Sequence, residues 1–328
     1  MNNVLLEVKD LETSLKINNE WLATVENISF ELSKGEVLGI VGESGCGKSI
    51  LSKSIIKLLP EKISKLSNGE VIFDGKRIDT LNEKQLLDIR GNDIAMIFQE
   101  PMTALNPVFT IKNQLLESIK SHKKISKKEA NNLAKDLLKK VGIARQDEIL
   151  NSYPHQLSGG MRQRVMIAMA ISCSPKLLIA DEPTTALDVT IQAQILDLLK
   201  ELQKETQMAI MMITHDLSVV AEFCDKVLVM YAGQIVEFGG IKEILHNPKH
   251  PYTQKLLSTI LKLKEEQKRL ETIEGIVPSI QAFHVNKCRF ANRCNKKMDI
   301  CNNQSPKMHV CEDVIVRCHL YKNEYKEI

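Results

Sequence analysis

Aromatic residues are scarce in this chain of 328 residues: they make up 4% of it, and Trp21 is its one tryptophan. A surface that stacks single-stranded nucleic acid needs several exposed rings along a basic groove. The net charge of only +3 at pH 7 supplies no strong basic excess either. The composition therefore argues against nucleic acid as a binding partner.

Long apolar runs are also missing. The longest are short pieces such as Ala209 to Ile213, whereas a membrane-spanning helix needs roughly 18 apolar residues. Met1, Asn2 and Asn3 lead into an alternating segment that lacks the basic flank and apolar core of a signal peptide. We therefore expect a cytosolic protein that reaches a membrane only through its partners.

The chain is 43% hydrophobic and 26% charged, which is typical of a folded protein with two domains, or one large domain and an appendage. From Ile241 onward there are 16 Lys and Arg against 10 Asp and Glu, whereas the first 240 residues carry 28 against 31. The last stretch also contains five of the eight cysteines: Cys288, Cys294, Cys301, Cys311 and Cys318. In a cytosolic protein such a cluster indicates metal binding or reduced thiols before disulfides.

Hydrophobic patterning predicts strands that alternate with helices. Strands are expected at 4–15, 27–32, 36–41, 69–73, 94–98, 176–180, 208–214 and 226–231. Helices are expected at 50–59, 190–205 and 217–223, and the pattern is helical throughout 110–173. Such alternation is typical of an α/β fold with a mainly parallel sheet, helices on its faces and antiparallel edge strands. A helical subdomain at about 105–175 interrupts it.

One glycine-rich segment follows a predicted strand and precedes a predicted helix. It consists of Gly42, Glu43, Ser44, Gly45, Cys46, Gly47, Lys48 and Ser49, and it matches the phosphate-binding pattern G-x-x-x-x-G-K-[ST]. Glycines let successive N–H groups point at phosphate oxygens, and the helix N-terminus adds a positive dipole end. We expect Lys48 to reach the β- and γ-phosphates of a nucleotide and Ser49 to ligate Mg²⁺.

An acidic pair ends the apolar strand Leu177 to Ala180. Asp181 is the expected ligand on the metal side, and Glu182 is the expected general base that polarises the attacking water. A simple loop turn would explain the pair equally well if it stood alone.

Further short motifs identify the family. Gln99 lies in Phe98-Gln99-Glu100-Pro101-Met102-Thr103-Ala104-Leu105-Asn106-Pro107; Leu157-Ser158-Gly159-Gly160-Met161-Arg162-Gln163-Arg164 precedes a helix; Ala186-Leu187-Asp188 and Thr214-His215-Asp216 follow the acidic pair. In this order they resemble the Q-loop, signature, D-loop and switch histidine of the ATPase subunits of ABC transporters. Met161 stands where many members of that family carry Gln.

The resemblance implies a head-to-tail dimer of two ATPase subunits. Lys48, Ser49, Asp181, Glu182 and His215 are then expected to hold MgATP. Ser158, Gly159 and Gly160 are expected to cap the ATP of the partner subunit, and Gln99 to sense Mg²⁺. Adenine needs an aromatic face before the glycine-rich segment, and Trp21 is the candidate, although a tryptophan in the core or an interface is as plausible.

The end of the chain resembles the C-terminal extension of oligopeptide and dipeptide importer ATPases. The resemblance rests on His250-Pro251-Tyr252-Thr253, Gly275-Ile276-Val277-Pro278 and Cys288-Arg289-Phe290-Ala291-Asn292-Arg293-Cys294. It implies a nucleotide-binding domain at 1–245 and an extension at 246–328.

Four cysteines match the pattern of that extension: Cys288, Cys294, Cys301 and Cys318. Structural zinc sites usually bring two cysteines within two to four residues, so the wider gaps here favour an iron–sulfur cluster, with zinc or unliganded thiols as alternatives. We expect a [4Fe–4S] cluster that is structural, with Arg289, Arg293 and Arg317 offsetting its negative charge, and nucleotide binding that does not depend on it.

The resulting functional hypothesis is an ATPase subunit that powers peptide import from the cytoplasmic face of the cell membrane. Two permease subunits, a second and non-identical ATPase, and indirectly an extracytoplasmic substrate-binding protein are the expected partners. A nickel or metal-chelate importer is the closest alternative. A soluble ABC ATPase that acts on DNA or ribosomes is a weaker one. Asp181 lies 133 positions after Lys48, which leaves no room for the long coiled coil of DNA-repair members, and ribosome-acting members usually join two ATPase cassettes where this chain has one.

Overall fold

The computed structural model of the chain describes residues 3–100, 104–185, 187–261, 275–283, 286–322 and 325–327. Residues 101–103 of the predicted Q-loop and Ala186 of the predicted D-loop lie outside these ranges. The chain forms two compact units. The first contains the residues up to 32, residues 37–79 and the residues from 212 onward; the second contains residues 33–36 and 80–211.

An antiparallel sheet begins the first unit. Its strands are ordered β2-β1-β4-β5, and they are β1 (Val4–Ile17), β2 (Glu20–Ser33), β4 (Ser64–Phe73) and β5 (Lys76–Arg77). Ile28, Phe30 and Leu32 are buried while the residues between them are exposed. This alternation is expected of a strand with one buried and one solvent-exposed face. Asp74 and Gly75 both have positive φ, so the predicted turn between β4 and β5 is confirmed.

A second sheet in the first unit has the strand order β3-β9-β10-β12-β11-β13. Its strands are β3 (Val37–Val41), β9 (Lys226–Tyr231), β10 (Gln234–Gly240), β11 (Met308–Cys311), β12 (Val314–Arg317) and β13 (Lys326–Glu327). β3 and β9 are parallel, and the remaining pairs are antiparallel. All five residues of β3 are buried, as expected for a strand covered on both faces.

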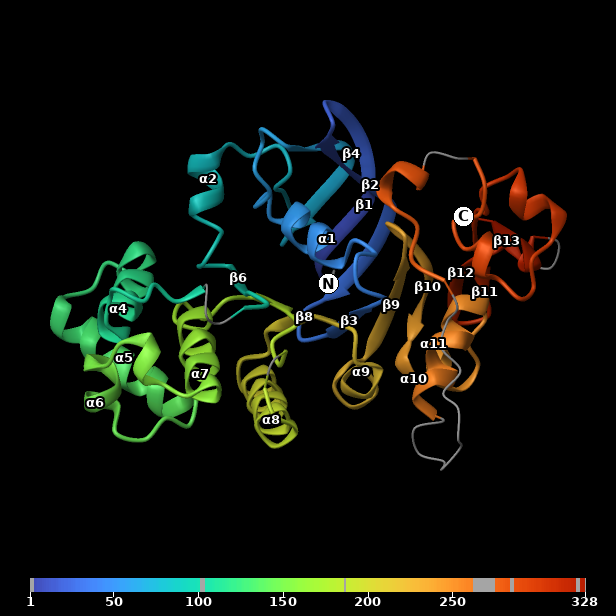
Figure 1. Ribbon diagram of the computed structural model, residues 1–328. Helices are drawn as coiled ribbons and strands as arrows, with labels where there is room; N and C mark the ends of the chain where they lie inside the picture. The colour runs from blue at the N-terminus through green and yellow to red at the C-terminus, as the bar shows by residue number, and fades with distance from the viewer. Residues whose placement is uncertain are drawn as a thin grey trace. The chain divides into compact units, whose positions relative to one another are not determined.

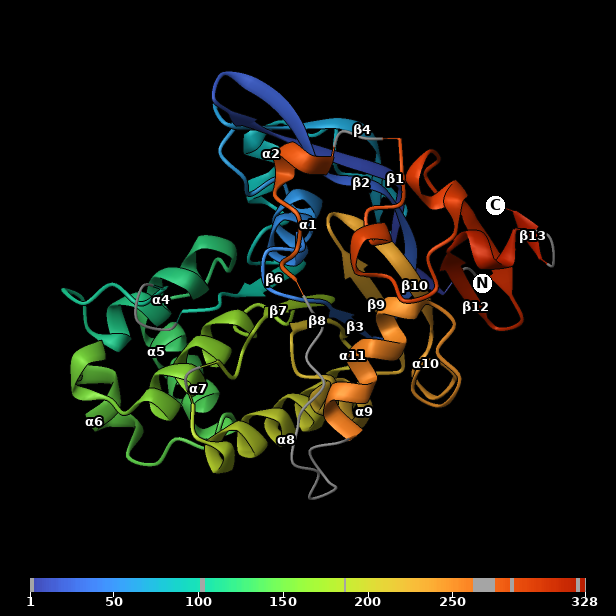
Figure 2. The ribbon, with the colours of Figure 1, turned by 45° about the vertical axis from the view of Figure 1, so that its right-hand side comes forward.

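In the described part of the first unit, four α-helices are present (Figures 1 and 2). They are α1 (Lys48–Ile55), α9 (Leu217–Phe223), α10 (Ile241–His246) and α11 (Pro251–Leu261). α1 lies against β1, α10 lies against β9 and β10, and α11 lies against α9. The phosphate-binding motif at residues 42–49 therefore belongs to the same compact unit as the C-terminal residues.

The second unit combines a parallel strand pair with a group of helices. β6 (Ile94–Ile97) pairs with β7 (Leu177–Asp181), and β8 (Ala209–Thr214) begins in this unit and ends in the first. The helices are α2 (Glu83–Leu87), α4 (Ile111–His122), α5 (Lys127–Lys140), α6 (Gln146–Asn151), α7 (Gly159–Ala170) and α8 (Val189–Thr206). The group α4 to α7, green in Figure 1, is the predicted helical insert. Thr110, Ser126 and Asp188 cap α4, α5 and α8 by accepting N–H bonds.

These elements confirm the predicted α/β fold, with one refinement. The sheet is mixed, because the antiparallel strands β10 to β13 extend it beyond the parallel pair β3 and β9. The domain boundary expected near residue 245 stays a prediction. Among the residues that the structure describes, no helix is both long and apolar enough to cross a bilayer.

The start of α11 is fixed by buried polar groups. The Glu237 carboxylate on β10 accepts the backbone N–H groups of Lys249 and His250 at 2.6 and 3.0 Å. His250 is 2% exposed, and its Nδ1 accepts the N–H of Tyr252 at 3.0 Å, so the ring is neutral. Burial lowers the pKa of His250 from 6.5 to about 3. Buried side chains thus bind the two residues before the helix and one N–H group of its first turn.

This burial predicts acid sensitivity. Between pH 6.5 and about 3 the unfolded chain binds a proton at His250 that the folded chain excludes, so stability falls as the pH drops, by up to about 1.4 kcal/mol per pH unit. Burial raises the pKa of Glu237, which acts in the opposite direction above pH 4.5. In His250→Asn, whose amide oxygen can still accept the Tyr252 N–H, the thermal unfolding midpoint should change less between pH 6.5 and 5 than in the wild type. Equal changes in both proteins would contradict the assignment.

Candidate nucleotide-binding site

The predicted phosphate-binding segment connects β3 to α1 in a strand–loop–helix arrangement. A Cβ atom at Gly42 would lie 2.3 Å from the carbonyl oxygen of Met230, so only glycine fits there. Gly47 caps α1 with a φ of +103°, which favours glycine. The Gly233 N–H donates to the Cys46 carbonyl at 2.8 Å and holds the loop against the turn after β9. The local geometry is that of an anion-binding loop at a helix N-terminus.

Lys48 is the first residue of α1 and is 5% exposed. Its ammonium group donates to the carbonyl oxygens of Gly42 at 2.8 Å and Glu43 at 3.1 Å. Ser49 follows it and is half-buried, while Ser44 and Gly45 at the loop tip are exposed. Cys46 is 1% exposed, and burial raises the pKa of its thiol. The lysine is therefore held over the loop that carries the predicted phosphate-binding amides.

The acidic pair lies in the second unit, at the carboxyl end of β7. Asp181 is 2% exposed. Glu182 has a φ of +49°, a conformation that non-glycine residues rarely adopt and that recurs at functional sites. Its Oε2 accepts hydrogen bonds from the Gln99 side-chain amide at 3.1 Å and from the Thr185 hydroxyl at 2.9 Å. The structure thus brings two predicted residues, Gln99 and Glu182, into direct contact.

His215 follows β8 in the first unit and is exposed. The residues on either side of it shape the turn: the Asp216 N–H donates to the Thr214 hydroxyl at 2.9 Å, and Asp216 caps α9 by accepting the Ser218 N–H at 2.8 Å. The Thr-His-Asp motif therefore has a structural explanation, since its outer residues fix the turn that presents the histidine.

The predicted signature begins α7. Ser158 is the N-cap, and its hydroxyl accepts the Met161 N–H at 3.3 Å. Ser158 and Gly159 are exposed, whereas a Cβ at Gly160 would lie 2.8 Å from Cγ2 of Ile191 on α8. The result is an exposed helix N-terminus without bulky side chains, which suits the approach of an anionic group. Met161, the departure from the family pattern, contributes its backbone N–H to the cap.

Trp21 lies on β2 and is 40% exposed. The Lys65 ammonium lies 4.7 Å from the centroid of its ring. On the same strand, the Thr24 carbonyl oxygen and a Val25 methyl group lie 3.6 and 3.4 Å from a Cβ built at Gly47. The strand therefore runs beside the phosphate-binding loop, and adenine stacking on Trp21 stays a prediction.

The cysteines of the extension come from separate turns. The Cys288 N–H donates to the Cys301 carbonyl at 3.0 Å, and the Lys296 N–H points at the Cys294 sulfur at 3.4 Å. Burial raises the pKa of the Cys318 thiol to about 12, and the charges of Cys288, Cys294 and Cys301 add to this rise. In the described part of the chain, however, no three His, Cys, Asp or Glu side chains are grouped closely enough to hold a metal ion. The expected metal site thus receives no direct support.

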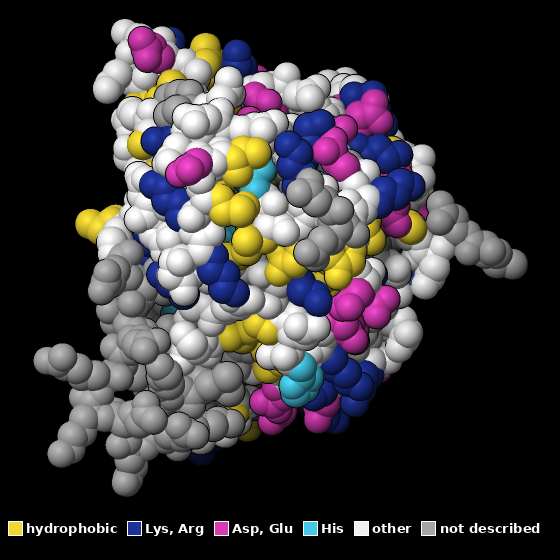
Figure 3. Space-filling view, turned by 90° about the vertical axis from the view of Figure 1, so that its right-hand side faces the viewer, with side chains coloured by type: hydrophobic (Ala, Val, Ile, Leu, Met, Phe, Trp, Pro, Cys, Tyr) yellow, Lys and Arg dark blue, Asp and Glu magenta, His cyan; other side chains and the backbone are white. Residues whose placement is uncertain are grey.

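Three arginines of the extension contact earlier segments of the first unit, to which the extension itself belongs. Arg289 pairs with Glu26 and donates to the Ala232 carbonyl at 2.6 Å. Arg317 donates to the Ile235 and Asn27 carbonyls at 3.0 and 3.3 Å. Arg293 pairs with Glu43 of the phosphate-binding loop at 2.9 Å. Figure 3 shows the face on which the C-terminal residues lie, where basic and acidic side chains are interspersed around small apolar patches.

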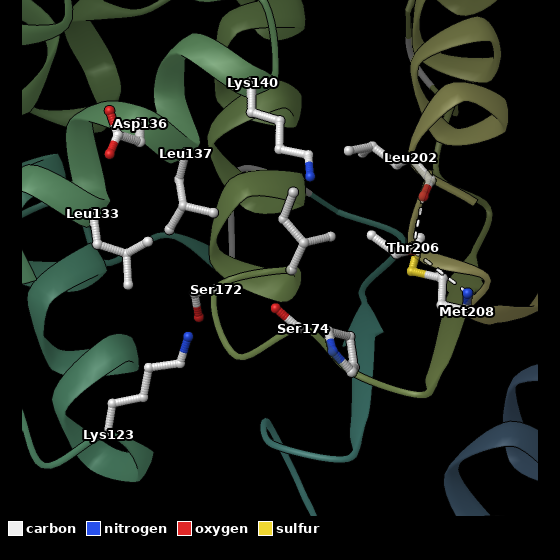
Figure 4. Close-up of a pocket in the computed structure, with 12 residues that line it drawn as sticks. Lys123, Leu133, Asp136, Leu137, Lys140, Ser172, Ser174, Leu202, Thr206 and Met208 are labelled. Carbon is white, nitrogen blue, oxygen red and sulfur yellow. Dashed lines mark hydrogen bonds between the residues drawn. The ribbon is translucent and has the colours of Figure 1, made fainter. Parts of the chain in front are cut away.

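The pocket in Figure 4 is separate from these motifs. It lies in the second unit between α5, the residues after α7 and the end of α8, and Lys123, Asp136, Lys140 and Thr206 are among its lining residues. None of the predicted site residues is among the twelve that are drawn.

Sequence reasoning missed two sets of contacts. The hydrogen bond from the Thr185 hydroxyl to Glu182 could not be predicted, because no sequence motif indicates it. Tyr252 and Arg293 both contact Glu43, whereas the sequence places Tyr252 only in the extension pattern and predicts that Arg293 offsets the charge of the cluster. The extension pattern could have indicated these contacts, because its polar and aromatic residues imply partners elsewhere in the chain.

Two family models match the chain. The model described as ABC transporter matches residues 25–185, and the model described as oligopeptide/dipeptide transporter, C-terminal region, matches residues 236–301. The oligopeptide transport ATP-binding protein AppD of Bacillus subtilis is 48% identical over 99% of both chains. The dipeptide transport ATP-binding protein DppD of the same organism is 48% identical over 94% of this chain and 92% of its own.

Solved structures agree in fold. A dimeric ATP-binding cassette in a post-hydrolysis state, bound to ADP and Pi, is 28% identical with a TM-score of 0.65, over 72% of this chain and 99% of its own. The cassette cbiO1 of Clostridium perfringens is 29% identical with a TM-score of 0.65, over 80% of this chain and 96% of its own. Together with the motif geometry, these matches show that the chain belongs to the ATP-hydrolysing subunits of ABC transporters, in the branch that carries the oligopeptide/dipeptide transporter C-terminal region.

Proposed function

We propose that this subunit hydrolyses ATP at the cytoplasmic face of a membrane and thereby drives import of peptides through two permease subunits. The observation that carries the proposal is the presence, in one chain, of the ATP-binding cassette and the oligopeptide/dipeptide-type C-terminal region. The similarity to peptide-transport subunits over nearly the whole chain supports it. A second, non-identical ATPase and an extracytoplasmic binding protein complete the proposed transporter.

Within the cassette, each motif has a proposed role. The loop amides of residues 42–49 and the Lys48 ammonium bind the phosphates of ATP, and Mg²⁺ is held by Ser49, Gln99 and Asp181. Glu182 accepts the proton of the attacking water, and His215 contacts the γ-phosphate. The hydrogen bond from Gln99 to Glu182 supports a joint role in hydrolysis, because a displacement of the Gln99 side chain would change the position of the Glu182 carboxylate.

Dimerisation supplies the remaining contacts. The exposed N-terminus of α7, with Ser158, Gly159 and Gly160, has the geometry of a second anion site and is proposed to cap the ATP of the partner ATPase. ATP binding then closes the dimer, and hydrolysis opens it. The permeases convert this cycle into transport.

The cysteines of the extension are proposed to hold a [4Fe–4S] cluster through Cys288, Cys294, Cys301 and Cys318. One backbone N–H group supports thiolate ligation there: the Lys296 N–H points at the Cys294 sulfur at 3.4 Å. N–H···S bonds stabilise thiolates, the ionised form that binds iron. Burial raises the pKa of Cys288 to about 11, so this thiol is neutral at pH 7 unless a metal ion displaces its proton.

Reconstituted vesicles test the substrate class. The chain, assembled with its permeases, the second ATPase and the binding protein, should accumulate a labelled peptide when ATP is supplied at the cytoplasmic side. Lys48→Ala should abolish uptake, since the phosphates lose their cation. ATP-dependent uptake of a nickel chelate without any of a peptide panel would identify a metal importer instead.

A further inference from the structure

Glu43, the second residue of the phosphate-binding loop, is held by residues far away in the chain. Its carboxylate Oε2 pairs with the Arg293 guanidinium at 2.9 Å, and its backbone N–H donates to the Tyr252 hydroxyl at 3.0 Å. Arg293 and Tyr252 lie 250 and 209 residues beyond it. Both belong to the C-terminal extension, so the extension contacts Glu43 of the loop through two groups, its carboxylate and its backbone N–H.

The ion pair is well enclosed. The Arg293 side chain is 7% exposed and that of Glu43 is 25% exposed. The other carboxylate oxygen, Oε1, is buried without a hydrogen-bond partner among the described residues. Arg293 also donates to the Tyr231 hydroxyl at 3.4 Å and to the Gly275 carbonyl at 3.2 Å. A planar guanidinium anchored at several points fixes its carboxylate partner in direction as well as distance.

The Tyr252 contact is supported by an aromatic cluster of Tyr231, Tyr252 and Phe290, which are at most 2% exposed. Ring centroids are 4.8 Å apart for Tyr231 and Tyr252, 5.1 Å for Tyr231 and Phe290, and 5.4 Å for Tyr252 and Phe290. Tyr231 ends β9, Tyr252 lies on α11 and Phe290 follows Cys288, so the cluster joins the extension to the sheet. Packed rings of this kind allow the Tyr252 hydroxyl little movement.

Glu43 in turn contacts the phosphate-binding groups. Its carbonyl oxygen accepts the Cys46 N–H at 3.2 Å and the Lys48 ammonium at 3.1 Å. All three polar parts of the residue are therefore engaged: the carboxylate and the N–H with the extension, the carbonyl with the loop and its lysine. A shift of Glu43 would be transmitted to Cys46 and Lys48.

We infer that Arg293 and Tyr252 position the phosphate-binding loop through Glu43, so that the C-terminal extension sets the affinity of this subunit for MgATP. They act as positioning residues, because Glu43 stands between them and the phosphates. The inference rests on the proposed role of residues 42–49 in binding ATP. The physical gain is preorganisation: a loop whose amides already point inward loses less conformational entropy when the nucleotide binds.

A double-mutant cycle on the full chain tests this inference. Glu43→Gln and Arg293→Gln should each raise the Kd for MgATP about fivefold, the effect of losing one hydrogen bond. The double variant should be no worse than either single one, because both remove the same contact. Tyr252→Phe should also weaken binding. Lys249→Ala, which removes an ion pair with Glu312 elsewhere in the extension, is the matched control and should bind as the wild type does.

The readout is equilibrium binding of a fluorescent ATP analogue, with thermal unfolding measured without nucleotide for every variant. If Arg293→Gln fails to fold, Arg293→Lys and Tyr252→Phe take its place in the comparison. Affinities within twofold of Lys249→Ala, or single effects that multiply in the double variant, would overturn the inference. Lys48→Ala separates the two hypotheses: wild-type affinity in that variant would contradict the phosphate site itself, whereas loss in Lys48→Ala alone would contradict only the positioning role.

Discussion

Glu182→Gln should leave MgATP binding unchanged and lower the turnover of the assembled transporter by at least about a hundredfold, the usual contribution of a general base. Gln has the shape of Glu but cannot accept the proton of the attacking water. Its amide oxygen can still accept the bonds that Gln99 and Thr185 donate to Oε2, so the turn after β7 should keep its structure. Phosphate release and equilibrium ATP binding are the two measurements.

Two variants serve as controls for this result. Glu182→Asp keeps a carboxylate but withdraws it by one methylene, and it should retain more activity than Glu182→Gln. Thr185→Ala removes one hydrogen bond to Oε2 and keeps the base, so its loss should be smaller still, about fivefold. Turnover of Glu182→Gln within a few fold of the wild type would rule out the role assigned to this carboxylate.

The sequence predicts those parts of the site whose structure is determined by residues close together in the chain. The loop from Gly42 to Ser49 needs only a strand before it, a helix after it and glycines at its turns, and β3 and α1 supply these within a few residues. The turn at Asp74 and Gly75 has the same local character. The patterns of strands 4–15 and 226–231 likewise lie within the segments themselves.

What the sequence does not predict depends on distant partners. β10 pairs with β12 through residues about 80 positions apart, such as Glu237 and Val316, and neither segment has a strong alternation of its own. The arginines of the extension show the same limit: we expected them beside the cysteine cluster, and their guanidinium groups contact Glu26, Glu43 and backbone carbonyls of the first unit. Side-chain direction follows from the packing of the whole unit, which no short motif encodes.

The proposed cluster gives the other large expected effect. Anaerobically purified protein should be brown, with about four irons per chain and absorption near about 400 nm. Cys294→Ser should lose the iron, because a hydroxyl is a poor replacement for a thiolate ligand. The sequence alone suggested that nucleotide binding would survive this loss. The structure changes that expectation: Arg293 directly precedes Cys294 and pairs with Glu43, so Cys294→Ser should also weaken MgATP binding.

Cys311→Ala is the control for the cluster, because Cys311 lies on β11, is fully buried and stands outside the four-cysteine pattern. It should keep all of the iron and the wild-type affinity for MgATP. Colourless wild-type protein with one zinc per chain would replace the cluster by a zinc site, and protein without metal would leave ordinary thiols. If Cys294→Ser loses the iron while its affinity for MgATP stays unchanged, the cluster stabilises only the extension, and Arg293 holds its place through its contacts with Tyr231 and Gly275.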